Sequence, residues 1–320
     1  MEKVYTLLVM NQRRIDESMY NKKIVESFLI YLISAMFFLA LSIISILKDF
    51  QIIGAISLIM LSFLSERTLY RIQDLIDTTS WKKDIRGLLR GRFLNKNEYI
   101  RISFAYLYRI KIFDKYLLVK NSRGTRKFQP VGGAYKFNDA ERLYLSEKFH
   151  ICDDSGIPVD NTSKNDYRLH LKAKYLRRFI RRFNSTQNRE MLSDLSREFI
   201  EELIKPQIVH FDKIAYRYLG RDFSRIQISR HFNCYELLLA DIVEVILDEQ
   251  QQTELEVLLT HASTEFGFFN SEDIKRCGIK PRTNDMHESI GDHTRKILVE
   301  YEESLTKTRY SSKKFSINLE

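Results

Sequence analysis

Two long apolar runs stand out near the start of the chain. The first, residues 28–47, reads FLIYLISAMFFLALSIISIL and carries no charged residue. Twenty helical residues span about 30 Å, which matches the hydrocarbon core of a bilayer. After a polar break at residues 48–51 comes a shorter run, residues 52–64. Together the runs predict a transmembrane hairpin over residues 28–65, with helices at about 28–47 and 50–65.

A buried hairpin of a soluble protein is the alternative interpretation. The first run is apolar on every face, whereas a helix at the surface of a soluble protein keeps a polar side. The run also starts too late, and extends too far, for a cleaved signal peptide. The membrane interpretation is therefore preferred.

The lysines and arginines around the hairpin predict its orientation. Five lie in residues 1–27 and seven in residues 66–92, whereas the connecting turn contains only Lys48. Loops rich in Lys and Arg stay on the cytoplasmic side of a membrane. We therefore expect both termini in the cytoplasm, with residues 1–27 as a short cytoplasmic segment and residues 66–97 as a juxtamembrane linker. Trp81 in this linker is expected to anchor at the membrane interface.

Beyond the linker the period of the pattern changes. Apolar and polar residues alternate from Tyr99 to Ile112, which predicts a half-buried strand. This prediction places the start of an α+β domain at residue 98 and its end at residue 303, with a loose basic tail at residues 304–320. The later predicted strands lie at 116–120, 214–219, 225–232 and 235–247, and the later predicted helices at 175–183, 188–204, 252–261 and 286–301.

Composition narrows the kinds of partner. The chain has 320 residues and a formal net charge of +9. Such an excess of positive charge suits the binding of nucleotides, nucleic acid or an anionic membrane surface. Part of the excess is explained by the lysines and arginines that orient the hairpin, so no DNA partner is expected. Cys152, Cys234 and Cys277 are far apart and form no CxxC pair, which favours free thiols in a reducing compartment.

One short acidic segment carries candidate chemistry. Glu198, Glu201 and Glu202 stand at positions i, i+3 and i+4, so on a helix they share one face. Clustered carboxylates suit Mg²⁺, which in turn holds substrate phosphates. The spacing alone favours the simpler interpretation, a solvated acidic face.

Three ordered motifs resemble those of a Nudix domain. Residues 197–202, REFIEE, are similar to the core of the Nudix box, Arg-Glu-apolar-x-Glu-Glu. Upstream, YLLVKNSRGTRKFQPVGG resembles the strand, turn and Pro-x-Gly-Gly approach to that box, and downstream FGFFNSEDIKRCGI resembles the closing segment of such domains. The similarity covers roughly residues 98–300. It implies a Nudix-like α/β/α sandwich with a mixed sheet, preceded here by the two-helix hairpin.

The resemblance also implies roles for the residues of the box. A membrane-anchored Nudix hydrolase would cleave nucleoside diphosphate derivatives with the help of Mg²⁺. In that case Glu198, as base or metal ligand, would act together with the metal ligands Glu201 and Glu202, and Arg197 would orient the carboxylates.

The box of this chain departs from the usual pattern in three ways. About fifty extra residues lie between Gly133 and the acidic helix. The usual glycine after the glutamate pair is replaced near Ile204. Glu190, the nearest candidate for an earlier glutamate of the box, is one position out of register. The loop that shapes a catalytic site is therefore expected to be altered.

One subfamily resembles the whole layout, namely the SMODS-associated Nudix domain; residues 290–298, IGDHTRKIL, are also similar to it. The resemblance implies an effector of CBASS, a bacterial anti-phage system. In such a system a CD-NTase synthase makes a cyclic di- or trinucleotide upon infection. The effector binds it, forms a homo-oligomer and disrupts the bilayer, which causes abortive infection. The chain would then be a multi-pass protein of the bacterial inner membrane.

Six residues are candidate contacts for such a ligand: Arg177, Arg178, Arg181, Arg182, Gly132 and Gly133. Guanidinium groups suit bidentate contacts with phosphates, and adjacent glycines allow a ligand to approach the backbone. The alternatives are a solvated or lipid-facing side of a helix for the arginines and a plain turn for the glycines.

Three functions remain open from the sequence. A sensor-effector binds a cyclic nucleotide and requires no cofactor, a membrane-anchored hydrolase uses Mg²⁺, and a membrane scaffold binds no small ligand. The sequence holds no Walker loop, GxGxxG, HExxH or GxSxG motif. Together with the altered box, this favours the sensor over an enzyme.

Overall fold

The computed structural model describes residues 26–76, 80–121, 125–154, 156, 163–229, 232–280, 286 and 288–319. By its internal contacts the chain divides into two compact units, residues 1–79 and 80–320. The boundary between them lies well before residue 98, where the soluble domain was predicted to begin.

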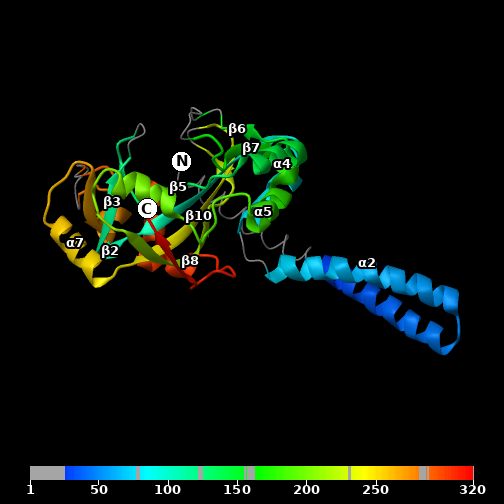
Figure 1. Ribbon diagram of the computed structural model, residues 1–320. Helices are drawn as coiled ribbons and strands as arrows, with labels where there is room; N and C mark the ends of the chain where they lie inside the picture. The colour runs from blue at the N-terminus through cyan, green and yellow to red at the C-terminus, as the bar shows by residue number, and fades with distance from the viewer. Residues whose placement is uncertain are drawn as a thin grey trace. The chain divides into compact units, whose positions relative to one another are not determined.

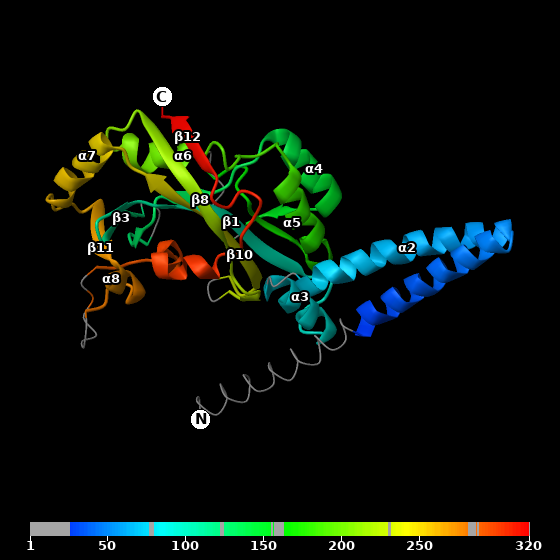
Figure 2. The ribbon, with the colours of Figure 1, turned by 90° about the horizontal axis from the view of Figure 1, so that it is seen from below.

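The first unit contains a hairpin of two helices, Glu26–Leu47 and α2, Gln51–Ile76 (Figures 1 and 2). Both helices are long and apolar enough to cross a membrane, judged by length and composition. The chain reverses at Asp49, whose φ of 59° is left-handed, and the Phe50 N–H donates to the carbonyl of Ser45 at 2.8 Å. Because α2 continues beyond residue 65, the expected linker begins as helix.

Small residues lie between the two helices of the hairpin. Ser45 and Ser57 are buried, and a Cβ added to Gly54 would lie 3.5 Å from Cβ of Ser45. The large apolar side chains face outward, so that Ile33 is 67% and Ile52 is 78% exposed. Close approach through small residues, with apolar bulk outside, is typical of helices that pack in lipid.

The second unit is built on a mixed sheet whose centre is a parallel pair of strands. β1, Tyr99–Arg109, runs parallel to β10, Tyr235–Ile246, and β8, Lys213–Phe223, is antiparallel to β10. The described strands of this sheet follow the order β12-β8-β10-β1-β7-β6, with β5 on β1 and β9 on β10. The predicted α+β class with a mixed sheet is confirmed. The remaining strands are β5 (Gly132–Ala134), β6 (Cys152–Asp153), β7 (Arg168–Lys172), β9 (Gln227–Ile228) and β12 (Lys314–Asn318).

A smaller antiparallel sheet and several helices complete this unit. The strands of the smaller sheet are β2 (Lys111–Ile112), β3 (Lys115–Lys120), β4 (Phe128–Gln129) and β11 (Phe266–Asn270). The α-helices are α3 (Ser80–Arg90), α4 (Asp139–Phe149), α5 (Leu176–Ser185), α6 (Ser196–Phe199), α7 (Glu249–Leu259) and α8 (Ser271–Lys275). The tighter or wider helical turns are η1 (Ala173–Tyr175), η2 (Ile200–Ile204), η3 (Asp292–Ile297) and η4 (Val299–Ser304).

The predicted basic helix is confirmed as α5, and its apolar face packs on the central sheet. The ring centroids of Phe179 and Phe183 lie 5.9 and 4.9 Å from that of Phe104 on β1. Full burial of a Phe side chain stabilises a fold by about 1.5–3 kcal/mol, so this contact fixes the helix against the strand. Figures 1 and 2 show α4 beside α5, and Arg182 joins them through an ion pair of 2.5 Å with the buried Glu141.

Three predictions about local structure are wrong. The helix predicted over 188–204 covers only Ser196–Ile204, because the preceding segment is irregular and the Glu190 N–H donates to the carbonyl of Lys136. The strand predicted over 225–232 is confined to Gln227–Ile228 among the described residues. β1 is buried on both faces rather than on one, since it is a central strand.

The end of the chain also differs from its prediction. In place of a helix over 286–301, the described residues form the short turns η3 and η4, and positions 281–285 and 287 lie outside the described residues. The tail predicted to be loose contains β12, which pairs with β8 and extends the central sheet. Main-chain pairing with a distant strand, which local periodicity does not report, orders this segment.

Part of the predicted linker belongs to the core of the second unit. Trp81 on α3 is only 3% exposed, and its ring centroid lies 5.9 Å from that of Phe223 on β8. Ile85, one turn later, is equally buried. The expectation that Trp81 anchors at the membrane interface is therefore wrong, and α3 is the first helix of the second unit.

Candidate functional site

The acidic segment is held against the centre of the sheet by aromatic side chains. Phe199 and Leu203 are fully buried, and the Phe199 ring lies 5.4 Å from that of Tyr108 on β1. The hydroxyl of Tyr108 donates to the carbonyl of Leu195, just before α6, and the hydroxyl of Tyr216 donates to that of Leu192 at 2.9 Å. These contacts fix the start of α6.

The helix changes its pitch within the acidic segment. The Lys205 N–H donates to the carbonyl of Ile200 at 2.8 Å, which is the i to i+5 bond of a π-helical turn. Such turns are rare and occur often at functional sites. In this chain the turn begins between Glu198 and Glu201, so it sets how these carboxylates are presented.

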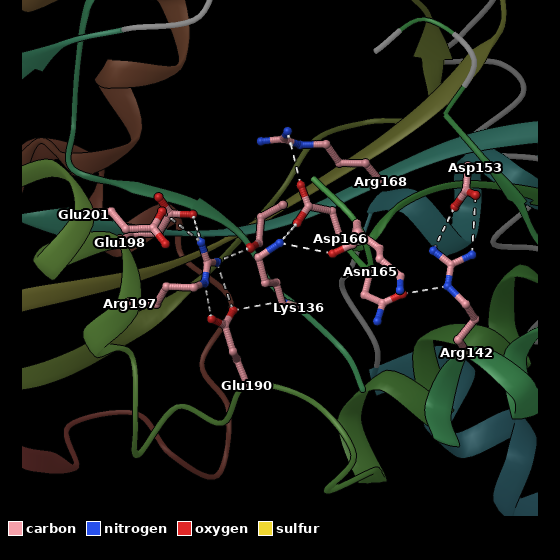
Figure 3. Close-up of polar contacts among 12 residues, drawn as sticks. Lys136, Arg142, Asp153, Asn165, Asp166, Arg168, Glu190, Arg197, Glu198 and Glu201 are labelled. Atoms are coloured by element: carbon pink, nitrogen blue, oxygen red, sulfur yellow. Dashed lines mark hydrogen bonds and ion pairs between the residues drawn. The ribbon is translucent and has the colours of Figure 1, made fainter. Parts of the chain in front are cut away.

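Arg197 is the centre of a network of carboxylates (Figure 3). Its Nε lies 2.5 Å from Oε1 of Glu190, and its Nη1 lies 2.5 Å from Oε1 of Glu198. Nη2 donates to the carbonyl of Ala134 on β5 at 2.9 Å, and Glu201 lies 3.7 Å from Nη1. One guanidinium therefore ties the acidic helix to the glycine strand and to the irregular segment that precedes the helix.

Glu190 takes part in this site although its sequence position is out of register. The Lys136 N–H donates to Glu190 Oε2 at 2.8 Å, so the carboxylate bridges Arg197 and the main chain after β5. The ammonium of Lys136 donates to Asp166 at 2.8 Å, and Asp166 also pairs with Arg168. As Figure 3 shows, these contacts link the acidic helix to β7 and its preceding loop.

The two predicted glycines lie beside the carboxylates rather than in a plain turn. The Gly132 N–H donates to Oε2 of Glu202 at 2.9 Å. A Cβ on Gly133 would lie 1.9 Å from Oε1 of Glu198, and a Cβ on Gly132 would lie 2.2 Å from the carbonyl oxygen of Tyr106. Gly132 also has a φ of +146°, which disfavours any residue with a side chain. Glycine is required at position 132 because the backbone passes close to β1, whereas a side chain at position 133 would have to displace the carboxylate of Glu198.

The environment of the carboxylates shifts their pKa values. Burial, followed by the negative charge of Glu198, raises the pKa of Glu202 to about 8, although the Gly132 N–H opposes the shift. Burial also raises the pKa of Glu198 and outweighs the adjacent Arg197 guanidinium. Burial opposes the charge of Arg197, but its bonds with Glu190 and Glu198 hold its pKa above the usual value. The site thus contains a permanent cation and at least one carboxyl that takes up a proton easily.

The carboxylates do not form a metal centre in this arrangement. Among the described residues, no group of three or more His, Cys, Asp and Glu side chains could hold a metal ion. Glu198 and Glu201 are directed to Arg197, whereas Glu202 is directed to Gly132. In this arrangement the carboxylates are paired with groups of the chain itself.

The four arginines of α5 are not brought to this site. Arg177, Arg178 and Arg181 are exposed, and the Arg178 guanidinium lies 5.9 Å from the ring centroid of Phe149. Arg182 pairs with Glu141, which also accepts from Thr186 at 2.8 Å, so its guanidinium serves the contact between α4 and α5. The structure therefore separates the candidate contacts into an arginine surface on α5 and a glycine-carboxylate site beside α6.

Two neighbours of the site carried no chemical signal in the sequence. Tyr106 alternates with other apolar residues of β1 and was expected in the core, where it lies fully buried. Its hydroxyl has no hydrogen-bond partner within the described part of the chain, and burial and the charge of Glu190 raise its pKa. Lys136 follows the glycine strand without any motif. Only the approach of β5 and α6 in space reveals their place.

The last motif noted in the sequence has a structural place. Ile290, Ile297 and Leu298 of IGDHTRKIL are buried, and the guanidinium of Arg109 donates to the carbonyls of the latter two at 2.6 and 3.1 Å. Gly291 N–H donates to the carbonyl of Phe128 at 2.8 Å. This segment therefore fastens β4 and the end of β1 to the C-terminal part of the domain.

Comparison with known proteins agrees with this architecture. A family model described as the SMODS-associated NUDIX domain matches residues 99–298. No curated protein matched the chain. The matched region begins with β1, includes the whole glycine-carboxylate site and ends with the segment held by Arg109. The chain belongs to the family of SMODS-associated NUDIX domains.

Proposed function

We propose that this protein is a membrane effector of CBASS whose Nudix-like domain senses a cyclic di- or trinucleotide. Membership in a SMODS-associated family supports the link to cyclic-nucleotide signalling and to a CD-NTase synthase. The two candidate membrane helices support an effector that acts on the bilayer. In this proposal both termini lie in the cytoplasm and the hairpin spans the bacterial inner membrane.

One observation favours sensing over hydrolysis, namely the pairing of the carboxylates with groups of the chain itself. Arg197 forms ion pairs with Glu190 and Glu198, and the Gly132 N–H donates to a carboxylate oxygen of Glu202. A catalytic metal would have to displace these contacts, and charge-assisted bonds of this kind are the stronger ones in proteins. The network is therefore better suited to hold β5 and α6 in one arrangement than to turn over a substrate.

The arginine surface of α5 is the proposed contact for the phosphates of the ligand. Arg178 and Arg181 are exposed, and a planar guanidinium binds phosphate oxygens in pairs. α5 is also fixed on β1 through Phe179 and Phe183. A ligand held there would act on an element that is rigidly joined to the sheet.

The output of the proposed effector is disruption of the membrane by an assembly. A hairpin of two helices is too small to line a channel alone, so activation requires several copies. A ligand shifts the equilibrium between single and assembled copies only as far as it binds the assembled state more tightly. We therefore propose that the bound nucleotide favours a homo-oligomer, whose clustered hairpins permeabilise the inner membrane and cause abortive infection.

A membrane-anchored Nudix hydrolase is the second candidate. The observation that favours it is the cluster of Glu190, Glu198, Glu201 and Glu202 around Arg197. This function predicts turnover of a nucleoside diphosphate derivative that depends on Mg²⁺. Glu202→Gln would abolish that turnover.

Charge reversal separates the two candidates. For the sensor, the double variant Arg178→Glu/Arg181→Glu should weaken nucleotide binding at least tenfold, since each charge-assisted contact contributes about 1.5–3 kcal/mol, whereas Glu202→Gln should leave binding in place. Lys111→Glu/Lys115→Glu makes the same change of charge on β2 and β3 and serves as control. Unchanged affinity in the α5 variant removes these arginines from the binding site, and turnover that Glu202→Gln abolishes favours the hydrolase.

A further inference from the structure

An exposed aromatic residue stands among cations where the second unit begins. Phe93, just after α3, is 72% exposed. Arg92 before it and Lys96 after it are exposed as well. A large apolar side chain surrounded by cations is the composition with which proteins enter the headgroup region of an anionic membrane.

The backbone holds Phe93 outward in a defined turn. The N–H groups of Phe93 and Leu94 both donate to the carbonyl of Leu88, at 3.1 and 3.2 Å, and Arg92 adopts a left-handed φ of 58°. Leu94 is buried in the core, with 2% exposed. The buried leucine fixes the turn, so the exposed position of its neighbour Phe93 is set by an ordered backbone.

The basic surface extends from this turn to the start of α5. Lys174 N–H donates to the carbonyl of Lys96 at 3.0 Å, and its ammonium donates to the side chain of Asn97 at 2.9 Å. Residues 80–98 contain six Lys and Arg against two acids, Asp84 and Glu98. Asp84 is directed to Arg225 at 2.6 Å, and Glu98 accepts from the Asn95 N–H, so neither carboxylate is directed to Lys174.

The short linker limits how far from the proposed membrane α3, the helix that precedes this turn, can lie. The second candidate span ends at Leu69 and α3 begins at Ser80, which leaves ten residues between them. Even fully extended, ten residues reach no farther than about 36 Å, and α2 is still helical up to Ile76, which shortens the reach. A surface tethered so closely to a bilayer meets lipid headgroups at high effective concentration.

We infer that Arg92, Phe93, Lys96 and Lys174 form a docking surface for anionic lipid headgroups. The cations attract the phosphates of the cytoplasmic leaflet, and the Phe93 ring enters the boundary between headgroups and acyl chains. Docking would hold the sensor domain against the membrane to which the hairpin anchors it. The inference rests on the proposed function in one respect, since it requires that the hairpin spans a membrane.

The test uses the full chain in lipid nanodiscs, with Phe93→Trp as a reporter of depth. One set of nanodiscs contains phosphatidylcholine alone and the other adds phosphatidylglycerol, each with brominated acyl chains as quenchers. Phe113→Trp is the matched control, because Phe113 is 65% exposed at the turn beyond the far end of β1. Trp81, the natural tryptophan, is buried and contributes an equal background to both variants.

Docking predicts that lipid bromines quench Phe93→Trp in anionic nanodiscs, and much less in phosphatidylcholine, while Phe113→Trp stays unquenched in both. Arg92→Glu/Lys96→Glu should lower the docked fraction, since each cation near such a surface favours docking roughly fivefold. Lys111→Glu/Lys115→Glu should leave it unchanged.

Provided that the chain is inserted in the nanodiscs, two results would overturn the inference. One is the absence of quenching of Phe93→Trp in both lipids, including the case in which a blue-shifted emission shows that the ring packs on protein. The other is equal quenching in both lipids, which excludes recognition of the headgroup charge. A chain that does not insert at all would contradict the proposed anchor, and is recognised separately by its loss from the nanodisc fraction.

Discussion

Nε of Arg197 lies 2.5 Å from Oε1 of Glu190, and the same guanidinium reaches Glu198 at an equal distance. All three side chains are largely shielded from water. Removal of the cation therefore leaves Glu190 and Glu198 without their charged partner, although the Lys136 N–H still donates to Glu190. This relationship makes Arg197 the structural centre of the candidate site.

Arg197→Ala should lower the stability of the second unit by about 2–3 kcal/mol, because charged groups that lose their partner inside a protein cost more than neutral ones. Thermal unfolding can be followed through Trp81, the single tryptophan, which is buried against Phe223. Arg181→Ala, at an exposed position of α5, is the control and should change little. Equal shifts for the two variants would contradict the central place of Arg197.

The protonation of Glu202 predicts a dependence of stability on pH. Its pKa is about 8 in the folded chain against an ordinary value of 4.5. Between these values the folded chain keeps a proton that the unfolded chain has lost, so the free energy of unfolding falls as pH rises from about 4.5 to 8. One proton contributes a slope of at most about 1.4 kcal/mol per pH unit.

Glu202→Gln should remove this part of the slope. The variant and the parent should be equally stable below the ordinary pKa of a glutamate, and the variant should be the more stable of the two above pH 8, since an amide has no proton to lose. Denaturant unfolding at a series of pH values measures both curves. Parallel curves over the whole range would show that Glu202 ionises normally.

Alanine should destabilise the fold more at position 132 than at position 133. Gly132→Ala brings a Cβ to 2.2 Å from a main-chain oxygen at a left-handed φ, which should cost at least about 2–3 kcal/mol. Gly133→Ala meets only the carboxylate of Glu198, a side chain that can turn away. Its cost should be smaller, about 1 kcal/mol.

A second substitution provides the control for this pair. Glu198→Ala removes the atoms that a Cβ at position 133 would meet, so it should suppress the effect of Gly133→Ala and leave that of Gly132→Ala unchanged. Thermal unfolding of the single and double variants forms a simple cycle. Additive effects of Gly133→Ala and Glu198→Ala would contradict the close approach of β5 and α6.

A charge in the first helix should separate membrane action from ligand binding. Phe38→Asp costs about 2.5–3.5 kcal/mol for a central position in a membrane helix, so toxicity in cells that make the cyclic nucleotide should be lost. Nucleotide binding by the second unit should persist. Phe38→Leu is the control and should remain toxic. A Phe38→Asp protein that inserts and is fully toxic would contradict this division.

Strong local patterns predicted the larger elements correctly. The two apolar runs, the apolar face of α5 around Phe179 and Phe183, and α7 (Glu249–Leu259) all appear near their predicted positions. Their signal lies within a few turns of one helix, where the residues that determine burial are close in sequence. For the same reason the family resemblance could be recognised from short motifs.

Elements that depend on distant partners were missed. α4 was not predicted, and its place depends on Glu141 meeting Arg182, forty-one residues later. β12 was expected to be a loose tail because nothing near it in sequence indicates that β8 offers an open edge. Glu190 reaches Arg197 despite its shifted position because the chain before α6 is not helical, so a register counted along a helix does not apply to it.

The measurement that tests the central claim is a titration of the full chain in nanodiscs with a panel of cyclic di- and trinucleotides. Calorimetry is performed with and without Mg²⁺, and each mixture is then separated by chromatography. The sensor predicts that one member of the panel binds tightly, independently of Mg²⁺, and is recovered intact. Binding of no member, or consumption of the nucleotide that requires Mg²⁺, would contradict it.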